Sequence, residues 1–142
     1  MPARDDAETP PTTPPMIRAI AMPSDANANG DIFGGWLMAQ MDLGGSNLAG
    51  RVAHGRIATV AVDAMSFLRP VKIGDEVSVY AGLVAVGRTS IKVNVEAWRR
   101  ARDSENERRV TRAVFTFVAI DSEGRPRPIA GGIGQAESGD LR

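Results

Sequence analysis

A single carboxylate interrupts an apolar, Gly-rich stretch of the chain, NANGDIFGGWLMAQMD, which spans residues 27–42. Between Asp31 and Arg51 the only charged residue is Asp42, which stands between Met41 and Leu43. A carboxylate in such a segment is either a structural group in a polar groove or the general base or nucleophile of a reaction. The residue type alone leaves both interpretations open.

Two glycines, Gly34 and Gly35, precede this carboxylate near the expected start of a helix. The first N–H groups of a helix have no intrahelical acceptor and can stabilise a developing oxyanion. Glycine lets a carbonyl approach closely, although it also serves helix packing. Eight residues separate Gly34 from Asp42, roughly 12 Å along a helix. We therefore expect the two to act on one carbonyl only if they come from different subunits.

Four further residues are candidates for binding phosphate: Arg88, Thr89 and Ser90 in VGRTS, and Arg69 in FLRP. The planar guanidinium group pairs with phosphate through two parallel hydrogen bonds. The alternatives are a solvated turn for the first three and a surface salt bridge for Arg69. His54 is expected to cap the helix C-terminus, and Thr59 is a secondary candidate as a hydroxyl near the groove.

The composition excludes several kinds of chemistry. The 142 residues include no Cys and one His, so disulfides, thiolate nucleophiles and a zinc site of the usual kind are not expected. Lys and Arg number 17 and Asp and Glu 17, which gives no overall field toward nucleic acid or anionic membranes. With no signal-peptide core and no long apolar run, the sequence predicts a cytoplasmic protein without membrane insertion.

The elements that must position these residues follow from periodicity and turn residues. We expect a disordered tail over 1–15, one domain over 16–128 and a flexible tail over 129–142. Asp31 is the predicted N-cap of a buried core helix. The segment 16–22 suits an edge strand, and four long strands are predicted at 57–68, 76–87, 88–100 and 109–121. One helix wrapped by an antiparallel sheet is an α+β domain, and its exposed edge favours a homodimer.

The chain resembles the YciA-type acyl-CoA thioesterases of the hotdog-fold superfamily in three stretches. They are NANGDIFGGWLMAQMD, AHGRIATVAVDAMSFLRPVKIGD and VGRTSIKVNVE. The resemblance covers residues 16–128. It implies a central helix wrapped by a curved antiparallel sheet, in dimers that assemble as a trimer of dimers. It also implies hydrolysis of acyl-CoA to free acid and CoA, without metal or cofactor.

Carried onto this chain, the resemblance makes Asp42 the catalytic carboxylate and Asn27 a polar partner that positions the thioester or water. Gly34 and Gly35 would supply the oxyanion N–H groups, and the hairpin would lie by the CoA nucleotide. The family's usual Glu after TVAV is Asp63 here, which weakens any role at that position. The alternative is a hotdog protein that binds or senses acyl-CoA without turnover.

Overall fold

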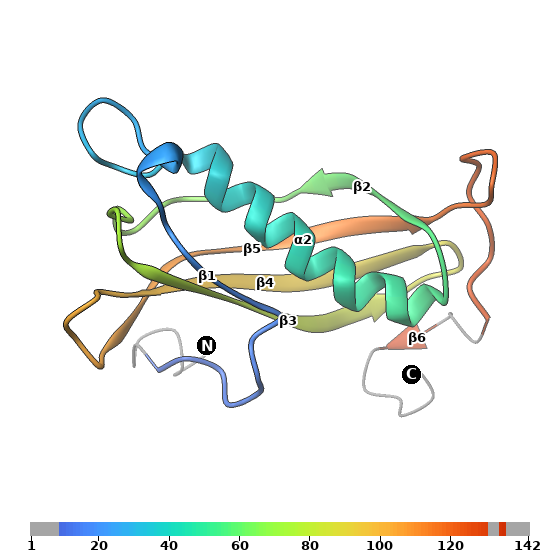
Figure 1. The fold of residues 1–142 in the computed structure, drawn as a ribbon. Helices are drawn as coiled ribbons and strands as arrows, with labels where there is room; N and C mark the ends of the chain where they lie inside the picture. The colour runs from blue at the N-terminus through green and yellow to red at the C-terminus, as the bar shows by residue number, and fades with distance from the viewer. Residues whose placement is uncertain (1–8, 131–133, 136–142) are drawn as a thin grey trace.

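The computed structural model describes residues 9–130 and 134–135, which form one antiparallel sheet and one long helix. The sheet path is β1-β3-β4-β5-β2, and β6 pairs with β3 off that path. Figure 1 shows the strands side by side beneath the helix. Their bounds are β1 Ile17–Ile20, β2 Ile57–Val62, β3 Glu76–Val86, β4 Ser90–Arg100, β5 Glu107–Ala119 and β6 Gly134–Gln135.

The helix α2, Gly34–Ala53, crosses one face of the curved sheet. Its buried face includes Leu37 and Met41, which are 2% and 0% exposed. Each such side chain stabilises the fold by roughly 1.5–3 kcal/mol through burial. Alternate residues of the sheet are also buried in the core: Val93, Val95, Phe115 and Phe117 are each at most 1% exposed. The expected wrapped-helix architecture is therefore confirmed.

The small residues in the middle of α2 let the helix lie close to the sheet. A Cβ on Gly44 would stand 2.7 Å from Val79 Cγ1, and one on Gly45 would stand 3.0 Å from Val95 Cγ2. Both distances are shorter than packed carbon atoms tolerate. At the start of the helix, by contrast, a Cβ on Gly35 would meet nothing within 4 Å. Packing therefore explains Gly44 and Gly45 but not Gly35.

This contrast gives a prediction on stability. Gly44→Ala should lower the free energy of unfolding by roughly 1–3 kcal/mol, because the added methyl overpacks the helix–sheet contact. The matched change Gly35→Ala should raise it by up to about 1 kcal/mol, because alanine is the better helix former. Urea denaturation of both variants measures the difference. Equal effects of the two changes would contradict the packing argument.

Several expected boundaries were wrong. The N-cap of α2 is Phe33 rather than Asp31, because the first helical N–H groups, those of Trp36 and Leu37, donate to the Phe33 carbonyl; the Asp31 carboxylate pairs instead with the Lys72 ammonium group. The predicted strand 57–68 ends at Val62. Beyond it the chain still follows β5, since the Asp63 N–H donates to the Val114 carbonyl and the Leu68 N–H to the Val110 carbonyl. A register shift between Thr59 and Ala61 breaks the regular ladder.

The ends of the chain lie partly outside the described residues. Of the tail expected over 1–15, residues 9–15 are described and form no helix or strand. Of the tail expected over 129–142, Ile129 is 5% exposed and belongs to the core. The short strand β6 pairs antiparallel with the end of β3. Ordered packing therefore extends past residue 128.

The helix ends as expected at His54, which is in the left-handed conformation with φ 55°. Its N–H donates to the Arg51 carbonyl, and the Gly55 N–H donates to the Gly50 carbonyl at 3.2 Å. These bonds satisfy carbonyls that the helix end would otherwise leave free.

Candidate active site

The Asp42 carboxylate is partly buried on α2 and is held by a hydroxyl group from the sheet. Thr59 Oγ1 donates a hydrogen bond of 2.6 Å to Asp42 Oδ1. That distance is typical of a hydroxyl bound to an ionised carboxylate, which is among the stronger hydrogen bonds in proteins. Thr59 belongs to β2, the last strand of the sheet path. The contact orients the carboxylate, and among the described residues no hydrogen bond to Oδ2 competes with a reacting group.

The N-terminus of α2 offers free backbone donors. The Trp36 and Leu37 N–H groups both donate to the Phe33 carbonyl. The N–H groups of Gly34 and Gly35 have no acceptor among residues 9–130 and 134–135. With the partial positive charge of the helix end, they can bind an anionic oxygen.

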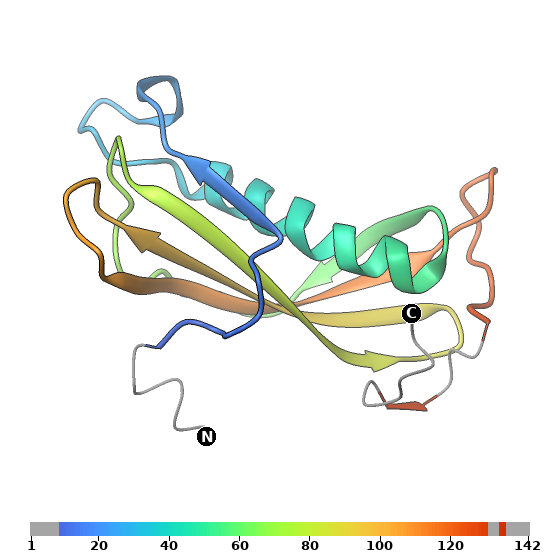
Figure 2. The same cartoon turned by 60° about the horizontal axis from the view of Figure 1, so that its bottom comes forward.

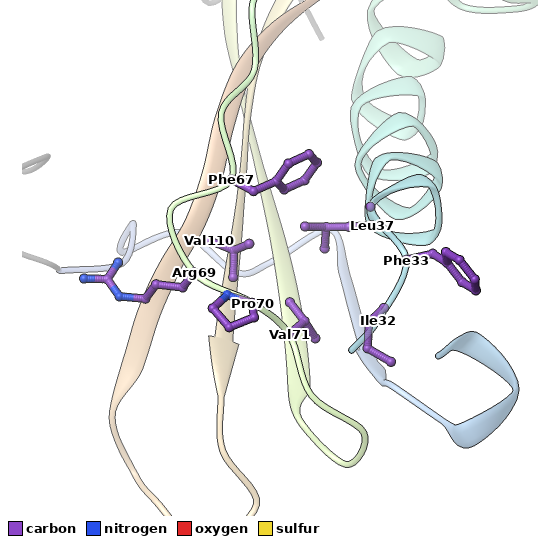
Figure 3. Close-up of a pocket in the computed structure, with 9 residues that line it drawn as sticks. Ile32, Phe33, Leu37, Phe67, Arg69, Pro70, Val71 and Val110 are labelled. Carbon is purple, nitrogen blue, oxygen red and sulfur yellow. The ribbon is translucent and has the colours of Figure 1, made fainter. Parts of the chain in front are cut away.

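A small cavity opens beside these donors. Its volume is about 150 Å³, and Gly34 is part of its wall. In Figure 3 the Phe67 ring and the Leu37 side chain point toward one another across it. The remaining lining residues are Ile32, Phe33, Arg69, Pro70, Val71 and Val110. The helix N-terminus therefore adjoins an almost wholly apolar pocket.

Asn27 lies in the loop that leads to α2, where its side chain has a local role. Its Oδ1 accepts the N–H of Asn29 at 2.9 Å and the N–H of Asp31 at 3.1 Å. Neither bond uses its Nδ2 group. Within the described part of one chain, Asn27 makes no hydrogen bond with Asp42. The expected pair is therefore not brought together by a single subunit.

The four expected phosphate-binding residues lie at two ends of the molecule. Arg88, Thr89 and Ser90 lie in the turn between β3 and β4, which is a hairpin as predicted. The Gly87 N–H donates to the Ser90 carbonyl at 2.8 Å, and Figure 1 shows this turn near the C-terminal end of α2.

Arg69 lies by the opposite end of α2. Its Nη1 donates to the Arg109 carbonyl at 2.7 Å, and Figure 3 shows its guanidinium group turned away from the helix. A single chain therefore does not gather the four residues.

Two residues of the site carried no signal in the sequence analysis. Phe67 and Val110 line the cavity beside Gly34, yet both read as ordinary residues of predicted strands. Phe67 is 46% exposed, but that exposure is a property of the fold, so nothing in the sequence distinguished it from a core aromatic residue.

In the described ranges, no group of three His, Asp or Glu side chains is placed to hold a metal ion. No helix in those ranges is long and apolar enough to cross a membrane.

Comparison with known proteins places this geometry in a family. A model of the thioesterase superfamily matches residues 29–105. The acyl-CoA thioester hydrolase YciA of Escherichia coli K12 is 52% identical over 117 residues, which cover 80% of this chain and 89% of YciA.

Solved structures agree with that match. One described as a hexameric broad specificity acyl-coenzyme A thioesterase superposes with a TM-score of 0.80 at 52% identity, covering 85% of this chain and 84% of its own. A hexameric hotdog fold thioesterase of Campylobacter jejuni gives 0.77 at 40% identity, covering 82% and 90%. The expected hotdog fold is confirmed, and the chain belongs to the thioesterase superfamily and, within it, to the family of the YciA-type acyl-CoA thioester hydrolases.

Proposed function

We propose that the protein hydrolyses acyl-CoA thioesters to a free carboxylic acid and CoA, with Asp42 as the reacting carboxylate. The observation that carries this proposal is the hydrogen bond of 2.6 Å between Thr59 Oγ1 and Asp42 Oδ1. It orients a carboxylate in a chain of this family, and a thioester carbonyl is an electrophile with a good leaving group. The proposed reaction uses no metal or cofactor, and CoA enters it as part of the substrate.

Two chemical routes use the same residues. As a general base, Asp42 takes a proton from water while the water oxygen attacks the thioester carbonyl carbon. As a nucleophile, Asp42 itself attacks and forms an anhydride, which water then hydrolyses. In both routes negative charge develops on the carbonyl oxygen, and the N–H groups of Gly34 and Gly35 stabilise it. The C–S bond then breaks and CoA thiolate leaves.

The active site requires two copies of the chain. Gly34 and Asp42 lie eight residues apart on one helix, roughly 12 Å, so one carbonyl cannot contact both in one chain. We place Asp42 of one subunit against Gly34 of another, with Asn27 positioning the thioester or the water there. The related structures are described as hexameric, which supports a homo-oligomer, and we propose a trimer of dimers.

The proposed oligomer can bring together the phosphate-binding candidates that lie apart in one chain. Arg88, Thr89 and Ser90 lie at the hairpin end of the molecule, and Arg69 lies at the other end. The CoA phosphates are proposed to bind Arg88 and its turn, with Arg69 as a further cation from a neighbouring subunit. An acyl-CoA substrate makes the cytoplasm the proposed compartment.

The test of this function is release of free thiol from a series of acyl-CoAs, short to long, by the wild-type protein at a checked oligomer mass. Turnover of the series is the expected result. Tight binding of acyl-CoA without any turnover would refute the hydrolase and favour the sensing protein instead.

A second prediction concerns Thr59 as a positioning residue. Thr59→Ala should lower kcat by about 10-fold to 100-fold with little change in KM, because a hydrogen bond to a charged group is lost. Thr59→Ser should retain most of kcat, because it keeps the hydroxyl group. Steady-state kinetics of both variants test this role. Thr116→Ala on β5 is the control and should keep the kcat of wild type. A Thr59→Ala protein with the kcat of wild type would contradict the role.

A further inference from the structure

The cavity beside the N-terminus of α2 has a chemical character that selects between the two halves of a thioester. Its walls include Ile32, Leu37, Phe67 and Val110. Among the described residues that line it, Arg69 alone is charged, and its guanidinium group is turned away and bound to the Arg109 carbonyl. The cavity therefore offers a ligand apolar contact and few hydrogen-bond partners.

The carbonyl of a thioester connects an acyl chain to the pantetheine arm of CoA. The arm contains two amide groups, which would lose their hydrogen bonds to water in such a pocket at a cost. An alkyl chain loses no hydrogen bonds there and gains burial. Because Gly34, the proposed oxyanion donor, is in the same wall, a carbonyl bound to its N–H group would stand at the pocket mouth.

Resting on the proposed function, we propose that this pocket receives the acyl chain and that Val110 decides how many of its carbons are held. Val110 comes from β5 and is 1% exposed. In Figure 3 the Leu37 side chain points from α2 toward Val110 and Phe67. A change in the volume of Val110 therefore changes the depth available to the ligand and leaves the exposed face of the molecule unaltered.

The volume of the pocket gives a number of carbons. It measures about 150 Å³, and an apolar cavity of about that size in another protein binds benzene. The pocket thus has room for an acyl group of roughly six carbons. Longer chains must leave it past Phe67, which is 46% exposed, so their further carbons gain less from burial.

The experiment measures kcat/KM against acyl length for wild type, Val110→Ala and Val110→Leu. For wild type we expect a rise of about fourfold per methylene up to roughly six carbons and a plateau beyond. Val110→Ala deepens the pocket and should move the onset of the plateau to longer chains by one or two carbons. Val110→Leu fills it and should move the onset to shorter chains. Val114→Ala, the same change on the same strand outside the pocket, should leave the profile unmoved.

Opposite shifts from the two Val110 variants support the proposal, because general destabilisation lowers activity at every length. A uniform change at all lengths, in variants whose thermal unfolding matches that of wild type, would overturn it in favour of a pocket for the pantetheine arm. An unmoved profile in both variants would also overturn it, with the hydrolase function intact. Absence of hydrolysis by wild type at every length would overturn the proposed function and this inference together.

Discussion

Asp42→Asn is expected to reduce kcat for acyl-CoA hydrolysis by at least about 100-fold, the usual contribution of a positioned general base. Asparagine has the shape of aspartate, and its Oδ1 can still accept the hydrogen bond that Thr59 Oγ1 donates at 2.6 Å. The variant therefore loses the charge while it keeps the contact between α2 and β2. It can neither take a proton from water nor attack the carbonyl carbon.

The measurement is thiol release at saturating acyl-CoA, with oligomer mass and thermal unfolding checked for each protein. Asp103→Asn is the matched control, because it removes a carboxylate from the exposed turn between β4 and β5. It should retain the activity of wild type. Full activity of Asp42→Asn at unchanged mass would remove Asp42 from the mechanism.

The elements of the fold were predictable where periodicity is local. Alternation over Ile91, Val93 and Val95 identified β4, and the VGRTS turn identified the hairpin with β3, which the register confirms. The end of the strand at Val62 was not predictable, because apolar residues continue to Leu68. Beyond Val62 the chain keeps hydrogen bonds to β5 only at Asp63 and Leu68 among the described backbone bonds, and where such pairing becomes irregular is a property of two strands.

The site was predictable only in part, for the same reason. Asp42, Gly34 and Gly35 stand out locally, since a charge and two glycines interrupt an apolar helix. Thr59 was named as a secondary candidate, a hydroxyl near the groove, but its hydrogen bond to Asp42 joins residues 17 positions apart and could not be read from the strand pattern. Val110 lies further still along the chain, and only the packing of the helix on the sheet brings it beside Gly34.

The second large effect is expected at the open edge of the sheet. In the described ranges β2 pairs with β5 on one side and with no strand on the other. Its residues Val60 and Val62 are 57% and 36% exposed, and Met38 of α2 is 39% exposed. An apolar strand with a free edge is a template for pairing with another chain. We infer that two copies associate here, which is also where Thr59 holds Asp42.

Val60→Glu should therefore dissociate the oligomer and abolish hydrolysis together. At a two-fold interface the new carboxylate occurs on both subunits, where it is desolvated and faces a like charge. We expect the dissociation constant to rise at least about 100-fold, an effect of the size seen at central interface residues. At protein concentrations below that dissociation constant, kcat/KM should fall to about 1% of the wild-type value or less. Separated subunits lose the partner's oxyanion donors, and loss of such a donor alone lowers the rate about 100-fold or more.

Light scattering and thiol release over a range of protein concentrations check both effects, and circular dichroism checks the fold. Because Val60 is exposed in the single chain, the subunit itself should stay folded. The control is Val84→Glu, at a residue of β3 that is 40% exposed. Because β3 pairs with β4 on one side and with β1 and β6 on the other, it offers no free edge to a second chain, and this variant should keep the oligomer. A Val60→Glu monomer with the activity of wild type would show that one chain holds a complete active site. Asp42 and Gly34 would then have to act on one carbonyl from a single helix, although roughly 12 Å separate them.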